Sequence, residues 1–148
     1  MSYENPISER FTLPSAAYGA TTASQKIRGP KGKIGYVRDI TVIPTADMVG
    51  TTTVPEVAVG ATQGAAEYAR FRLGTAVGTG YTAAQGVRRA RPLATTTTTP
   101  PTLTDFAAHV QLETARIPAD TDVFVSGVQG VGGTPAGTFV AYVDVEWF

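Results

Sequence analysis

Cysteine is absent from this 148-residue chain, and histidine occurs once. Disulfides, thiolate metal sites and cysteine nucleophiles are therefore excluded. Serine hydrolysis needs a histidine base, and the only candidate, His109, lies in a strand-like run between Ala108 and Val110. Ser126 lacks the glycine two residues before it that a nucleophile elbow requires. We therefore predict no catalytic residues, no cofactor and no enzymatic activity.

Charge is also scarce, since charged residues make up only 16% of the chain and twelve basic residues balance twelve acidic ones. This balance argues against a surface tuned to nucleic acid, and it favours association into an oligomer or a larger assembly. Four carboxylates, Asp120, Asp122, Asp144 and Glu146, could supply oxygen ligands to calcium. No spacing brings them together, and Asp144 and Glu146 alternate as solvated strand residues do, so we predict no metal site.

Long apolar runs are missing too. No stretch approaches the ~20 residues that a membrane-spanning helix needs. The first ten residues carry Glu4 and Glu9 where a signal peptide would carry a basic and then an apolar segment. We therefore expect a soluble protein without a membrane partner, synthesised in the cytoplasm.

What the chain does have is two-residue periodicity, broken by glycine and proline. The clearest case is the last segment, where every second residue from Phe139 to Trp147 is apolar. Similar patterns indicate strands at Gly35 to Thr45, where Pro44 should end the strand, and at four further segments: Val54 to Ala61, Glu67 to Leu73, Ala107 to Leu112 and Val123 to Val128. We predict an all-β domain over residues 24–148, an antiparallel β-sandwich or jelly roll of about seven or eight strands.

Residues 1–23 show no sustained periodicity and contain Pro6 and Pro14. They are predicted to form an extended N-terminal arm, and the alternative is a short edge strand around Arg10 to Leu13. In an arm, three isolated aromatic residues would be candidate anchors on a partner: Tyr3, Phe11 and Tyr18.

A glycine-rich basic segment, RGPKGKIG, covers Arg28 to Gly35 and follows Lys26. It lacks the Walker spacing and precedes a strand, whereas a phosphate loop precedes a helix. Three readings stay open: a turn whose glycines adopt positive φ and whose lysines are solvated, a basic contact surface for a protein, and a site for nucleic-acid backbone. The candidate contact residues are Lys26, Arg28, Lys31 and Lys33.

Further along the chain, a second basic cluster of Arg88, Arg89 and Arg91 is expected to form salt bridges with a neighbouring chain. It precedes a threonine tract, Thr95 to Thr99, which ends in Pro100 and Pro101. This composition predicts a long extended loop, either at the outer surface of an assembly or clasping a neighbour.

Several segments together carry a resemblance that runs from about Ser24 to the end of the chain. They are KIRGPKGKIGYVRDITV (Lys26 to Val42), VGTTTVPEVAVG (Val49 to Gly60), IPADTDVFV (Ile117 to Val125), GGTPAGTF (Gly132 to Phe139) and VDVEWF (Val143 to Phe148). In these segments the chain resembles small virion structural proteins encoded near the major capsid gene of tailed phages. The resemblance implies a capsid decoration (cement) protein, a homotrimer that binds the major capsid protein on the phage head.

Two alternatives stay open. One is another phage structural component, such as a head fibre base, a tail protein or an adaptor. The other is a carbohydrate-binding module that stacks sugars on Tyr81, Tyr142 and Trp147. Trp147 belongs to the apolar strand face, so we expect it in the core instead.

Overall fold

The structure is a computed structural model that describes residues 5–18, 22–76, 78–90, 110–111 and 116–148. In these ranges the regular elements are antiparallel strands and one short 3₁₀ turn, η1 (Ala83–Gln85). The predicted all-β antiparallel fold is confirmed. No helix in the described ranges is long and apolar enough to cross a membrane.

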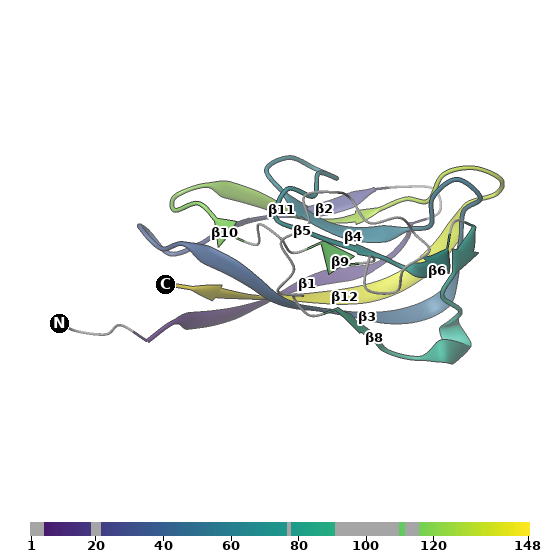
Figure 1. Ribbon diagram of the computed structural model, residues 1–148, viewed down its shortest axis with the longest axis horizontal. Helices are drawn as coiled ribbons and strands as arrows, with labels where there is room; N and C mark the ends of the chain where they lie inside the picture. The colour runs from purple at the N-terminus through teal and green to yellow at the C-terminus, as the bar shows by residue number, and fades with distance from the viewer. Residues whose placement is uncertain (1–4, 19–21, 77, 91–109, 112–115) are drawn as a thin grey trace.

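Two sheets form the layers of a sandwich (Figure 1). The first sheet has the order β1 (Ile7–Ala17), β12 (Ala136–Trp147), β3 (Gly35–Val49) and β10 (Arg116–Ile117), and β8 (Arg88–Ala90) also pairs with β3. The second has the order β2 (Ala23–Arg28), β11 (Asp122–Val128), β4 (Glu56–Gly60), β5 (Ala69–Arg72) and β9 (Val110–Gln111). A small separate hairpin joins β6 (Gly74–Ala76) and β7 (Thr79–Gly80).

The core lies between the two sheets and is built by the two-residue period. The inward residues of β12 are all buried: Phe139, Ala141, Val143, Val145 and Trp147. From the second sheet they are covered by Val57, Val59, Phe71, Val123 and Val125. The predicted inward face of the last strand is confirmed, and so is the core position of Trp147, whose exposed fraction is 1%.

The N-terminal segment corrects one expectation. Residues 7–17 form no arm, because β1 is an edge strand paired antiparallel with β12 from Ile7 to Ala17. The alternative of an edge strand is the one observed, and the strand is longer than Arg10 to Leu13. Its apolar alternation was obscured in the sequence by Glu9 on the inner face and by Pro14, which lies at a shift in the register.

Pro44 does not end its strand, as had been expected, because β3 continues to Val49. The pairing with β12 is irregular at this point, since Pro44 lies opposite Phe139 and the next pair is Ala46 with Thr138. On the other side of β3, pairing with β8 stops at Val42. A proline is tolerated at such a bulge because no ladder hydrogen bond is required of its nitrogen.

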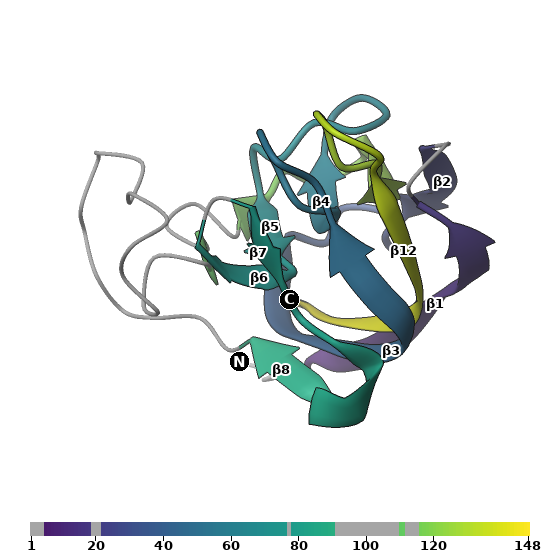
Figure 2. The ribbon, with the colours of Figure 1, turned by 90° about the vertical axis from the view of Figure 1, so that its right-hand side faces the viewer.

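Viewed along the sandwich, β1 and β2 lie on the same flank (Figure 2). Each is the edge strand of its own sheet, and the two are in contact. The opposite end of each sheet order is formed by shorter strands, β10 and β9. The described part of the chain therefore presents two free sheet edges together.

Candidate interaction surface

A tight turn, Gly29–Ile34, joins β2 to β3 at one end of the sandwich, and we call it the basic turn. Gly32 has φ +73° with open space around it, a conformation that suits glycine. The Lys33 amide donates to the Pro30 carbonyl at 3.1 Å. Asp120, itself at φ 56°, accepts the Gly32 amide on its carboxylate at 3.1 Å. The reading of this segment as a turn with positive-φ glycine is confirmed.

The buried indole of Trp147 packs against the basic turn from the core side. A Cβ added to Gly29 or Gly35 would lie 2.3 or 2.4 Å from Trp147 Cζ3, so the ring fills the space that these glycines leave. The indole Nε1 donates to Glu9 at 2.7 Å. Two main-chain hydrogen bonds of 2.8 and 2.9 Å join Ile34 to Phe148. The turn is thus held in one place by packing and by backbone pairing.

Beside the turn, on the outer face of the first sheet, lies an aromatic–arginine cluster of Tyr36, Arg38, Glu146 and Phe148. The rings of Tyr36 and Phe148 meet edge to face with centroids 5.7 Å apart. The Arg38 guanidinium carbon is 5.5 and 5.7 Å from these two rings, within cation–π range, and its Nε pairs with Glu146 at 2.7 Å. Phe148 is 46% exposed although it is anchored in this way.

An open depression of about 340 Å³ adjoins the cluster, lined by Ser8, Glu9, Arg10, Arg38, Asp144, Val145 and Glu146. Arg10 makes a bidentate pair with Asp144, at 2.7 and 2.9 Å. The hydrogen bond to Asp144 and its negative charge raise the pKa of Arg10. Four of the five ionic groups around the depression are therefore paired within the chain, and the fifth, Glu9, accepts a hydrogen bond from the Trp147 indole.

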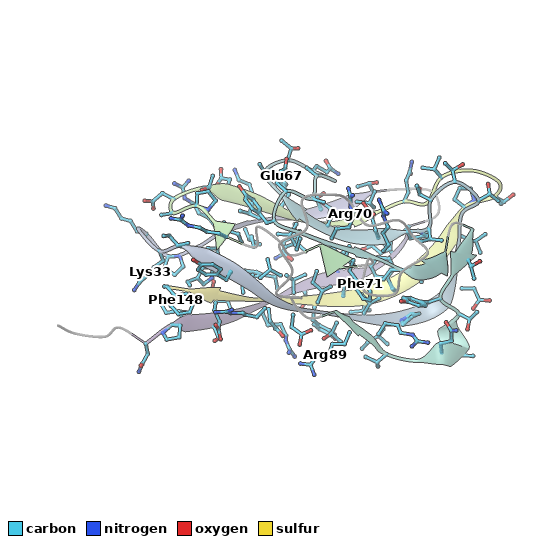
Figure 3. The ribbon with its side chains drawn as sticks, viewed as in Figure 1. Lys33, Glu67, Arg70, Phe71, Arg89 and Phe148 are labelled. Atoms are coloured by element: carbon cyan, nitrogen blue, oxygen red, sulfur yellow. The ribbon has the colours of Figure 1, made fainter. Side chains whose placement is uncertain are left out.

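Figure 3 shows Lys33 and Phe148 at the same end of the molecule. The four predicted basic contact residues lie along β2 and this turn. Lys26 and Arg28 both pair with Asp122, at 2.8 and 3.3 Å, and the hydrogen bond from Lys26, followed by the two positive charges, lowers the pKa of Asp122. Lys31 is exposed at the turn.

The predicted aromatic anchors are not gathered at this site. Tyr18 is fully buried, stacks on Phe139 at 4.2 Å and donates its hydroxyl to the Pro14 carbonyl at 2.9 Å. Burial raises the pKa of Tyr18 to about 12. Its expected role as an exposed anchor is wrong, because the chain folds it back into the core. Phe11 is partly buried against the core on β1, and Tyr3 lies outside the described residues.

Other expected groups have structural partners. Arg89 pairs with Asp39 and Arg88 lies over the Tyr81 ring at 4.8 Å, so both have partners within the chain. Arg91, His109 and the threonine tract fall outside the described residues. The buried Ser126 hydroxyl is bonded to Ser24 and to the Gly64 amide, each at 2.9 Å. Among described residues, no group of three or more potential metal ligands converges.

No protein-family model, curated protein or solved structure matches this chain. The residues that sequence reasoning missed at this surface are Tyr36, Arg38 and Phe148. One signal was available for Phe148, which is an aromatic residue on the otherwise polar face of the last strand. The cluster itself depends on pairing between residues about a hundred positions apart, which no local pattern reveals.

Proposed function

We propose that this chain is a non-enzymatic virion structural protein, a decoration protein that binds the major capsid protein on the head of a tailed phage as a homo-oligomer. The binding surface is the basic turn together with the aromatic–arginine cluster. The observation that carries the proposal is the anchored, half-exposed ring of Phe148 next to a turn fixed by Trp147. The sequence resemblance supplies the identity of the partner.

Several physical features of this surface support binding to a protein. Aromatic residues and arginine are enriched where interfaces concentrate their binding energy. A turn that is already ordered loses little conformational entropy on binding, so more of the contact energy appears as affinity. The exposed Lys31 adds positive charge at the rim, and such a charge accelerates encounter with an acidic partner surface.

The sugar-binding alternative has less support. Two of its three candidate stacking rings, Tyr81 and Trp147, are 2% and 1% exposed and belong to the core. Only Tyr142 is partly exposed, and the Arg10 guanidinium lies 5.6 Å from its ring centre. A platform for sugar needs open aromatic faces, so a protein partner is the better fit.

The test is saturation binding of the purified chain to undecorated heads. We expect Phe148→Ala and Lys31→Gln each to weaken binding, Phe148→Ala by about ten-fold or more. Matched controls lie at the other end of the sandwich: Val131→Ala removes a 50% exposed side chain and Thr134→Glu makes the same charge change as Lys31→Gln. Both should bind as the parent does. Equal losses from the two pairs would reject the surface.

The location of the protein tests the wider proposal. Quantitative mass spectrometry of separated heads and tails should find the chain in heads at a fixed copy number. A chain found only in tails would instead make it a tail or adaptor component. That outcome would end the decoration proposal even if the same surface proved to be the one that binds.

A further inference from the structure

The outer edge of β1 is an unpartnered strand edge with regular geometry. β1 pairs with β12 on one side, and no described strand pairs with its other side. From Ile7 to Leu13 the register with β12 runs without a shift, and the irregularity begins only beyond Leu13. Within these seven residues, every second one therefore directs its main-chain donor and acceptor away from β12, toward the flank of the sandwich.

This edge has little of the usual protection, and its one inward charge, Glu9, is already bonded to Trp147. Monomeric proteins guard exposed edges with lysine, proline, bulges or inward charges. Residues 7–13 contain neither lysine nor proline. Their two charged residues are engaged within the subunit, since Glu9 accepts the Trp147 indole proton and Arg10 holds Asp144 on the outer face. The neighbouring edge strand β2, in contrast, carries Lys26 and Arg28, which are both exposed.

Apolar surface accompanies the free edge. Phe11 points to the inner side of the sheet and is partly buried against the core, so part of its ring remains uncovered at the flank. Ile7 is 42% exposed. A strand added here would gain main-chain hydrogen bonds and would also cover this surface.

We propose that residues 7–13 pair antiparallel with the same residues of a second copy, about a two-fold axis at Phe11. The partner proposed for this edge is the same edge of a second copy. A two-fold axis perpendicular to the sheet pairs both free edges at once and continues the sheet with the inner faces of both copies on the same side. Charge selects this register. Centring on Arg10 or Glu9 would set like charges opposite each other, whereas centring on Phe11 sets Arg10 opposite Thr12 of the second copy and the two Phe11 rings together.

This pairing goes beyond the proposed function and rests on the edge alone. It predicts an even number of copies, in place of the trimer that the resemblance implies. The first residues of this edge lie beside the basic turn, because Ile7 is opposite Trp147, whereas Phe11 at the proposed axis is opposite Val143, farther along β12. Pairing is therefore tested by changes at Phe11 and Thr12, and shell binding by changes at Phe148 and Lys31.

The absence of cysteine makes a direct test possible. Opposed residues in an antiparallel pair have Cα atoms about 4.5–5.5 Å apart, within the reach of a disulfide, and residues one register step away do not. Under mild oxidation Phe11→Cys should therefore give a covalent dimer, and Thr12→Cys should give little. Cross-linking of both to the same extent, or of neither, would overturn the register.

Charge variants test the edge without disturbing the core, because Thr12 is exposed. Thr12→Lys places two like-charged pairs across the axis and should raise the dimer dissociation constant by about ten-fold or more, whereas Thr12→Glu, facing Arg10, should lower it. Sedimentation equilibrium gives the mass. A monomer or a trimer for the parent chain, or a dimer indifferent to both variants, would overturn the pairing. A parent chain that dimerises but does not bind undecorated heads would count against the proposed function instead.

Discussion

Gly35→Ala is the substitution that tests most directly how the core holds the basic turn. Gly35 is buried and its φ lies outside the left-handed region, so alanine is allowed by the backbone. The added Cβ would lie 2.4 Å from Cζ3 and 2.7 Å from Cε3 of Trp147, closer than real Cβ contacts come. Because the ring is 1% exposed and held by Glu9, it cannot swing into solvent.

The magnitude follows from two opposing effects. Overpacking a well-packed core costs about 1–3 kcal/mol. Replacing glycine by alanine at a permitted backbone position returns about 0.4–1 kcal/mol by restricting the unfolded chain. We therefore expect Gly35→Ala to lower the free energy of unfolding by about 1–2 kcal/mol, the middle of the range that these two effects leave. For a chain of this size that corresponds to a fall in Tm of about 2–8 °C.

The assay is urea unfolding followed by far-ultraviolet circular dichroism, which reports on chains with and without Trp147, the only tryptophan. The control is a double-mutant cycle with Trp147→Leu, which removes the ring that the Cβ would meet. In the Trp147→Leu background, Gly35→Ala should be neutral or stabilising. An equal cost of Gly35→Ala in both backgrounds would refute the account of the braced turn.

Three further predictions concern the stability of the folded chain. Glu9→Ala leaves the buried Trp147 indole proton without its acceptor and should cost about 1–3 kcal/mol in urea unfolding, whereas Glu9→Gln keeps an acceptor and should cost less. Tyr18 keeps its proton to about pH 12 when folded and to about pH 10 when unfolded, so its contribution is complete below pH 10 and is lost between pH 10 and 12. The loss is at most about 2.7 kcal/mol, and Tyr18→Phe should flatten that part of the stability–pH curve. Asp120→Ala should destabilise by about 1–2 kcal/mol because alanine resists positive φ and cannot accept the hydrogen bond from the Gly32 amide. Asp120→Asn keeps an acceptor and should be close to neutral in the same assay.

The sequence was sufficient for the fold class and for the strands whose two faces differ. Every second residue from Phe139 to Trp147 is buried, as the pattern predicts. In β5, buried and partly buried residues alternate as predicted. β1 was harder because Glu9 interrupts its apolar face. The reason for that glutamate is the indole of Trp147, which is 138 residues away along the chain. A local window cannot distinguish such a partnered charge from a solvated one.

The candidate surface was predictable only in part, for the same reason. The basic turn was recognised from glycine and lysine spacing. The cluster beside it joins Tyr36 and Arg38 of β3 to Glu146 and Phe148 at the end of the chain, through strand pairing that sequence distance conceals. Tyr18 shows the converse error, since its isolation among small and polar residues suggested exposure, whereas the turn after β1 places it on Phe139.

Two neighbouring residues at the end of the chain, Trp147 and Phe148, link the stability of the fold to the proposed binding surface. Trp147 points inward and fixes Gly29 and Gly35, and Phe148 points outward and pairs its backbone with Ile34. Consequently the path of the basic turn is set by the core, whereas the exposed Lys31 is free of that constraint. Changes at Lys31 should therefore alter affinity for a partner at nearly constant stability. Changes at the two glycines should alter both together, because the surface is displaced whenever the indole is.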